Sequence, residues 1–91
     1  MIIKVKSFAA FRNILGKERI VELAEGADVD LLLKVLTKSR VEAYPLIFGD
    51  AGLREDVNIF VKGKNIESLQ GLSTKLVEGD EVALFPAAIG G

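Results

Sequence analysis

The stretch IIKVKSF, residues 2–8, alternates between apolar and polar side chains. The aliphatic residues Ile3 and Val5 fall on one face of an extended chain, and the two lysines fall on the other, which is the period of a half-buried β-strand. Phe8 continues the alternation on the lysine face. The sequence therefore predicts a strand with one face for a core and a second face that carries lysines and an aromatic ring.

Three later segments have the same alternating character, and a fourth is shorter. Residues 19–23 are expected to pair as an antiparallel neighbour of residues 2–8, with a helical turn closed by Gly16 between the two strands. Gly63 marks a turn after the third strand. The further strands are predicted at residues 57–62, 65–66 and 81–85.

An amphipathic helix is predicted after residue 28. Asp28 can accept hydrogen bonds from the free N–H groups of the first turn, and Asp30 is placed favourably near the positive helix end. Apolar residues at spacings of three, four and seven predict a core-facing stripe that covers a sheet. The members of this stripe are Val29, Leu32, Val35 and Leu36.

The order of these elements predicts the fold class. Pro45 and the glycines at 49 and 52 favour a long connection over residues 40–56 with one short helical turn, and residues 67–79 are expected to form a loop. Strand, strand, helix and three further strands indicate an α+β fold, a ubiquitin-like β-grasp with one main helix on one face of a mixed sheet. We expect one domain over residues 1–85 and a flexible tail over residues 86–91.

Composition excludes several classes of function. With 91 residues, 12 Lys and Arg and 13 Asp and Glu, the net charge is −1, so we expect neither nucleic acid nor membrane as a partner. No apolar run approaches the ~20 residues that a membrane helix needs. Lys4 and Lys6 interrupt the N-terminus where a secretion signal would be apolar, which favours a cytoplasmic location.

The chain contains no Cys and no His, which removes thiol nucleophiles, Cys/His zinc sites and the commonest general base. The one tight acidic cluster is Glu78, Asp80 and Glu81. Paired carboxylates can bind metal or act as acid and base, but a solvated turn explains this cluster as well, and a hydrolase using it stays an alternative. No phosphate-binding glycine loop is present, so nucleotide binding by this chain is not supported.

Three phenylalanines form a candidate interface. By strand parity Phe8, Phe60 and Phe85 each lie opposite the aliphatic residues of their own strand, so all three are expected on the uncovered face of the sheet. Exposed aromatic clusters tend to mark protein interfaces. The alternative is that Phe8 or Phe85, near a strand end, folds into the edge of the core.

The last six residues, PAAIGG, carry no charge and end on Gly90 and Gly91. A segment of this length can thread a narrow channel in another protein, and the two terminal glycines have no side chain that would block it. The free carboxylate of Gly91 can attack the α-phosphate of ATP held by a partner, which gives an acyl adenylate. A sulfur nucleophile would convert the adenylate to a thiocarboxylate, and a lysine amine would convert it to an isopeptide bond.

Three stretches carry a family resemblance that extends over essentially the whole chain: MIIKVKSFAAFRNILG at 1–16, EGADVDLLLKVL at 25–36 and LVEGDEVALFPAAIGG at 76–91. They resemble the small, sulfur-carrying subunit of molybdopterin synthase, in the ubiquitin-like β-grasp family. The resemblance implies that an E1-like enzyme uses ATP to adenylate Gly91, that the terminus becomes a thiocarboxylate, and that the tail inserts into the large synthase subunit. It also implies a carrier that is not itself an enzyme and binds no cofactor of its own.

The resemblance bears on individual residues. Phe8 and Phe85 match aromatic positions that the family uses against the large subunit, whereas Phe60 has only the parity argument. Pro86 follows Phe85 as in the molybdopterin type, although Ala87 stands where a second proline is common and Lys62 where an asparagine is frequent. Similar chains act in thiamine-type sulfur transfer or as ubiquitin-like protein modifiers, and both remain alternatives.

Overall fold

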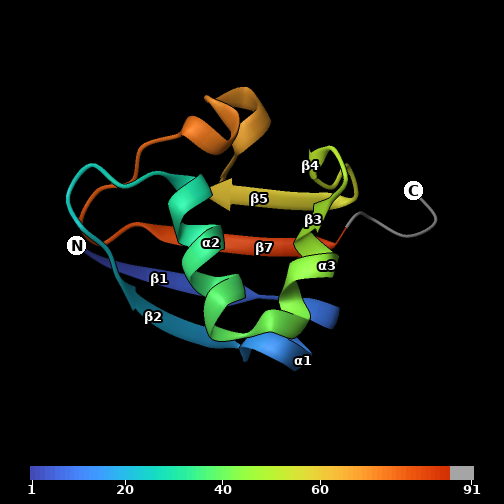
Figure 1. Cartoon of the computed structure of the whole chain (residues 1–91). Helices are drawn as coiled ribbons and strands as arrows, with labels where there is room; N and C mark the ends of the chain where they lie inside the picture. The colour runs from blue at the N-terminus through green and yellow to red at the C-terminus, as the bar shows by residue number, and fades with distance from the viewer. Residues whose placement is uncertain (87–91) are drawn as a thin grey trace.

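The computed structural model describes residues 1–86 (Figure 1). Three short 3-10 turns, Val41–Ala43, Ile66–Ser68 and Gly71–Ser73, join the longer elements. The helices and strands are β1 (Ile2–Ser7), α1 (Ala10–Leu15), β2 (Glu18–Glu22), α2 (Val29–Ser39), α3 (Tyr44–Ile47), β3 (Phe48–Gly49), β4 (Gly52–Leu53), β5 (Val57–Val61), β6 (Lys64–Asn65) and β7 (Glu81–Pro86).

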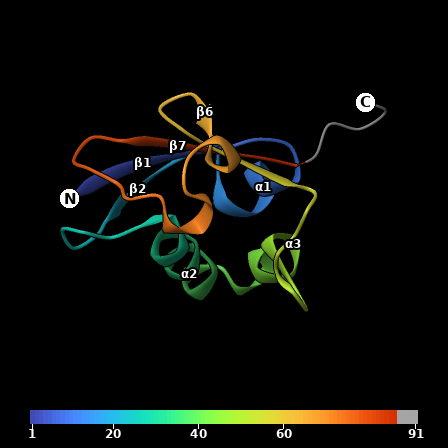
Figure 2. The same cartoon turned by 90° about the horizontal axis from the view of Figure 1, so that it is seen from above.

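Five strands form one mixed sheet in the order β2-β1-β7-β5-β6, and β3 and β4 form a separate two-stranded ribbon. The first and last strands, β1 and β7, are parallel neighbours at the centre, and the other pairs of the large sheet are antiparallel. The parallel pair requires a crossover, which α2 supplies on one face of the sheet (Figures 1 and 2). This is the β-grasp arrangement that the sequence predicted.

The core lies between the sheet and α2. On the three central strands every second residue faces the helix and is buried, as the alternation predicted. These residues are Ile3 and Val5 of β1, Val57, Ile59 and Val61 of β5, and Val82 and Leu84 of β7. The other face of the sheet has no helix over it (Figure 2).

Helix α2 begins as predicted and presents a slightly different face. The Asp28 carboxylate accepts a hydrogen bond from the Leu31 amide at 2.9 Å, which caps the first turn. The prediction that Val35 belongs to the core stripe is wrong: its side chain is 36% exposed, whereas Leu33 is fully buried. The buried stripe runs through 29, 32, 33, 36 and 37, so Val35 lies at the flank of the helix. Within residues 1–86 no helix is long and apolar enough to cross a membrane.

Residues 40–56 are more ordered than the predicted connection. Pro45 stands in the first turn of α3, where its missing N–H costs nothing, so it starts a helix rather than breaking one. Ala43 and Ile47 are fully buried against the core. Arg54 fastens the segment, because its guanidinium donates to the Pro45 carbonyl at 2.9 Å. The loop predicted at 67–79 likewise contains the two last 3-10 turns.

Several strand ends differ from the prediction by one residue, and the clearest cases are at β6 and β7. The hairpin β5–β6 closes through Lys62 and Gly63, whose φ values of 52° and 79° are those of a type I′ turn, so β6 begins at Lys64. At the other end, β7 continues through Pro86, which pairs with Val57. Pro86, predicted as the first tail residue, is therefore the last residue of the sheet.

Candidate functional site

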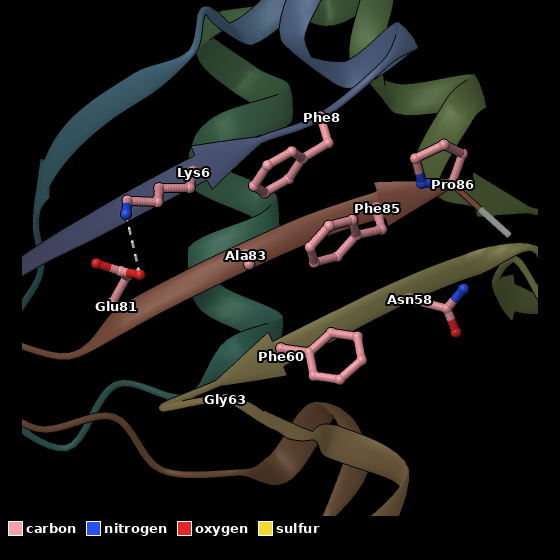
Figure 3. A pocket seen from close by; sticks show the side chains of 9 residues that line it. All are labelled: Lys6, Phe8, Asn58, Phe60, Gly63, Glu81, Ala83, Phe85 and Pro86. Atoms are coloured by element: carbon pink, nitrogen blue, oxygen red, sulfur yellow. Dashed lines mark ion pairs between the residues drawn. The ribbon is translucent and has the colours of Figure 1, made fainter. Parts of the chain in front are cut away.

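Three aromatic rings meet on the uncovered face of the sheet (Figure 3). The rings of Phe8 and Phe85 are stacked, with centroids 4.2 Å apart and planes inclined by 6°. Phe60 meets Phe85 edge to face, at a centroid distance of 5.5 Å. The strands β1, β7 and β5 are neighbours in the sheet. Phe8 directly follows β1 and continues its pairing with β7, and Phe60 lies diagonally from Phe85, because the residue paired with Phe60 on β7 is Ala83. The predicted grouping of the three rings is confirmed, and Phe8 and Phe85 do not fold into the core edge.

The backbone around Phe8 explains why its ring stays on this face beyond the end of β1. The Phe8 amide donates to the Leu84 carbonyl at 3.1 Å, which extends the β1–β7 pairing by one residue. The next residue, Ala9, has φ 54° and ψ −129°, a conformation that residues with a Cβ rarely adopt. The chain thus turns sharply into α1 directly after the aromatic ring.

The rings line an open groove with a volume of about 720 Å³. Ala83 lies on β7 between Phe85 and the charged end of the strand, and its small side chain leaves the space in front of the rings free (Figure 3). Phe8 is 38% exposed, and Phe60 and Phe85 are half-buried. An apolar groove of this kind can accept an apolar side chain of a partner protein.

Two ion pairs lie on the same open face of the sheet as the groove. Lys6 Nζ lies 3.4 Å from Glu81 Oε1, and Lys4 Nζ lies 3.5 Å from Glu18 Oε1. The side chains of both pairs are between 39% and 48% exposed, so solvent screens them and they add little to stability. Of these residues only Lys6 and Glu81 line the groove, where they place a polar border beside the aromatic rings, as in many protein interfaces.

Pro86 connects the groove to the C-terminal residues. It lines the groove and is the last residue that the structure describes, so the described part of the chain ends beside the aromatic rings. Gly90 and Gly91, the predicted reactive residues, lie outside the described residues. The order of the sequence still places them only four and five residues after Pro86.

The acidic cluster has a structural explanation. Glu78 accepts a hydrogen bond from the Ile2 amide at 2.9 Å, and Glu81 pairs with Lys6. Asp80, expected on a solvated turn, is only 3% exposed: Oδ2 accepts from the Val77 amide at 2.8 Å, which closes the turn. Asp80 Oδ1 lies 3.2 Å from Lys62 Nζ, an ion-pair distance without hydrogen-bond alignment.

The three carboxylates therefore serve separate contacts. In the part of the chain that the structure describes, no three acidic, His or Cys side chains are grouped to hold a metal ion. The residues of the groove likewise include no nucleophile paired with a base.

One charged pair lies on the far side of Pro86. The Arg54 guanidinium donates to both carboxylate oxygens of Asp56, at 2.9 and 2.6 Å, and this bond lowers the pKa of Asp56 below its ordinary 3.8. Arg54, Asp56 and Pro86 border a small recess with Ala10 and Phe11. The pair fixes the chain entering β5 next to the end of β7.

The sequence prediction placed Lys6 on the face of the rings without assigning it to the site, and it missed the lining residues Asn58, Glu81 and Ala83. The signal was available, because each has the same parity in its strand as the phenylalanine it accompanies. Parity identifies the face of every side chain, but only the order of the strands reveals which ones become neighbours.

The amino-acid sequence from residue 5 to residue 91 matches the model of the ThiS family. The chain belongs to the ThiS family. This ThiS-family chain is 28% identical to small archaeal modifier protein 3 of Haloferax volcanii over the full length of both proteins. The family resemblance inferred from the sequence is thereby confirmed.

Solved structures agree with this family and with the fold. The solution structure of small archaeal modifier protein 1 from Methanosarcina acetivorans superposes with a TM-score of 0.87 and is 32% identical, covering 99% of this chain and 96% of that one. A Pyrococcus furiosus protein assigned as subunit 1 of a molybdopterin converting factor has a TM-score of 0.79 and 34% identity, covering 96% and 98%. Relatives of this ThiS-family chain thus include both modifiers and a protein assigned to molybdopterin formation.

Proposed function

We propose that this protein is a carrier whose Gly91 carboxylate is activated by a partner enzyme and then transfers sulfur. The observation that carries the proposal is the position of the aromatic groove. It opens beside Pro86, the last residue of the sheet and five residues before Gly91. A partner that binds the rings therefore lies within reach of the terminal carboxylate.

The chemistry belongs to the terminus and to the partner. An E1-like adenylating enzyme holds ATP, a Gly91 carboxylate oxygen attacks the α-phosphorus, and pyrophosphate leaves. A sulfide then attacks the acyl carbon and displaces AMP, which leaves a thiocarboxylate at Gly91. The chain itself supplies a carboxylate on a slim segment and binds no cofactor, since Gly90 and Gly91 add no side chain that would obstruct an active-site channel.

The acceptor that we propose is the large subunit of molybdopterin synthase, which would receive the sulfur from the inserted terminus. Phe8, Phe60, Phe85 and Pro86 would form the contact with that subunit. Support comes from the similarity to the Pyrococcus furiosus protein and from the aromatic residue followed by proline at 85 and 86. In this role the protein is a non-catalytic subunit of a synthase.

A second candidate function is covalent modification of proteins. The same adenylate would be attacked by a lysine amine, AMP would leave, and Gly91 would be joined to the target by an isopeptide bond. The similarity to two small archaeal modifier proteins, one of them over its full length, favours this candidate. Both candidates share the activation step and differ only in the nucleophile.

The shared step is tested by activation of the purified chain. The protein is incubated with the cognate E1-like enzyme, ATP and radiolabelled pyrophosphate, and exchange is compared with a variant that carries one extra residue after Gly91. The extension should abolish exchange and leave the melting temperature almost unchanged, because the carboxylate must be terminal while the core ends at Pro86. Normal exchange by the extended variant would refute the proposal.

The two candidates are separated by mass. Intact mass spectrometry of protein isolated from its native cells would reveal an oxygen-to-sulfur exchange at Gly91 in a sulfur carrier. Peptide mapping of the same cell extract would reveal lysines linked to Gly91 if the protein is a modifier. Isopeptide adducts without any thiocarboxylate would favour the second candidate.

A further inference from the structure

The free edge of the sheet is formed by β2, which has β1 on one side and no strand on the other (Figure 1). The Leu23 amide donates to the Met1 carbonyl at 2.8 Å, and the Ser7 amide donates to the Lys17 carbonyl at 3.1 Å. Residues 17 and 23 therefore bond to β1, and in an antiparallel ladder the bonding residues alternate. The backbone N–H and C=O groups of Glu18, Ile20 and Glu22 consequently point away from the sheet.

A groove runs beside this edge, between β2 and α2, which lie next to each other in both views (Figures 1 and 2). Its volume is about 290 Å³, and its apolar wall consists of Val21, Val35 and Leu36. Val35, which was predicted to be in the core stripe of α2, is partly exposed here, and Ile20 on the edge strand β2 is 60% exposed. The groove thus offers apolar contacts directly alongside unpaired backbone groups.

One end of the groove carries a positive charge. Arg19 lies at the end near the C-terminus of α2, where its guanidinium donates to the Ser39 hydroxyl at 3.3 Å. A strand added to β2 would place alternate side chains over Val21 and Val35, and a carboxylate at one end would lie against Arg19. A second copy of β2 fits less well, since Glu18 and Glu22 would bring further negative charge to the edge.

We infer that this edge binds an extended peptide segment of another protein, with aliphatic residues at alternate positions and a carboxylate at the end next to Arg19. The segment adds a strand to β2 and places its aliphatic side chains in the groove beside α2. The site is separate from the aromatic groove, which lies on the other face of the sheet. The inference is independent of the chemistry at Gly91, so a chain with an extended terminus should bind the segment equally well.

The test uses the full chain, labelled with ¹⁵N, and a capped peptide of about eight residues in which valine and threonine alternate and two glutamates stand at one end. A second peptide has the glutamates at the other end, because strand direction is part of the question. One of the two should bind with a dissociation constant at or below about 1 mM and slow hydrogen exchange at Glu18, Ile20 and Glu22. Binding by neither peptide would overturn the inference.

A backbone control separates strand addition from simple apolar contact. The same peptide with N-methyl groups on alternate amides cannot donate to the edge, so its affinity should fall at least tenfold. Equal affinity of the methylated peptide would overturn strand addition. Self-association of the chain through β2 in the absence of peptide would also overturn the inference, because the edge would already be occupied.

Matched variants locate the groove. Val35→Asp should reduce peptide affinity at least tenfold, whereas Leu31→Asp, at a similarly exposed position of α2 that does not line the groove, should leave it unchanged. Arg19→Glu should weaken binding of the peptide, because the new carboxylate repels the glutamates of the peptide. The same variant should bind a peptide whose glutamates are replaced by lysines. Equal effects of the aspartates at 31 and 35 would overturn the assignment.

Discussion

The two faces of the sheet are built from the same strands and have opposite characters. On β7 the residues Val82 and Leu84 are fully buried under α2, whereas Ala83 and Phe85 between and after them line the aromatic groove. On β5 Ile59 is in the core and Phe60 is in the groove. Neighbouring residues thus contribute to two different features, the core under α2 and the groove to which we assign partner binding.

This division has a physical cause. A strand turns successive side chains to opposite faces, and one helix can cover only one face. The covered face of the central strands carries buried aliphatic side chains and the small Ser7, while the open face includes aromatic rings that remain partly in water. Contact of large apolar rings with water is unfavourable in the free protein, which is consistent with a surface that is covered by a partner.

The largest expected effect contrasts adjacent residues of β7. Leu84→Ala should lower the free energy of unfolding by about 3 kcal/mol, because it removes fully buried methyl groups and leaves a cavity. Ala83→Gly, next to it on the open face, should cost about 1 kcal/mol or less. Urea denaturation followed by circular dichroism gives both values. Similar losses at 83 and 84 would contradict the separation of the two faces.

The second prediction concerns the aromatic rings. Replacing Phe8 and Phe85 with Ser should weaken binding to the large subunit or the activating enzyme at least tenfold, because clustered aromatic residues dominate interface energies. The lost stack should cost the free protein about 1 kcal/mol. Calorimetric titration measures the affinity, and a thermal melt verifies folding. Unchanged affinity in a folded double variant would remove the rings from the interface.

Phe60 provides a sharper version of the same test, because it touches Phe85 only by its edge. Phe60→Leu keeps an apolar side chain beside Phe85 and should reduce the affinity less than the double substitution. A loss as large as that of Phe8 and Phe85 together would make Phe60 the main contact.

The third prediction concerns Ala9, where the chain turns sharply from Phe8 into α1. Ala9→Gly should raise the free energy of unfolding by about 1 kcal/mol, because glycine adopts φ 54° and ψ −129° without strain. The greater entropy of the unfolded chain with glycine offsets part of this gain. Partner affinity should not change, because the Phe8 ring keeps its place. Thermal unfolding measures the gain, and destabilisation by Ala9→Gly would contradict the strained conformation.

The smallest effect is that of the Arg54–Asp56 pair. The hydrogen bond from Arg54 lowers the pKa of Asp56 in the folded chain, so the pair stabilises the fold above the unfolded value of 3.8 and is lost as the pH falls through the lowered pKa. Asp56→Asn should therefore be less stable than the parent chain at pH 7, and the difference should shrink below pH 4. A difference that does not depend on pH would show that the charge is not involved.

Much of this arrangement was predictable from local patterns. Strand parity alone assigned the faces of β1, β5 and β7. Asp28 marked the start of α2, because a carboxylate at that position can accept hydrogen bonds from the free amides of the first turn. The aromatic cluster followed from the same parity once the strands were known to be neighbours. These features depend on the spacing of residue types along each strand or helix and not on contacts between distant parts of the chain.

Other features depended on tertiary packing. Pro45 and the following glycines have the composition of a connection, and the burial of Ala43 and Ile47 against the core decides that they fold into helical turns and a short ribbon. Asp80 is polar and close to a glycine, which indicates an exposed turn, yet its carboxylate closes that turn from inside. A sequence pattern does not reveal which polar group finds its partner in the interior.

The parallel pairing of β1 and β7 has a consequence for synthesis of the chain. The first strand made is separated from its central neighbour by the whole domain, and β5 also depends on β7 for its place in the sheet. Until residues 81–86 have left the ribosome, β1 and β5 each expose an unpaired edge that invites aggregation or chaperone binding.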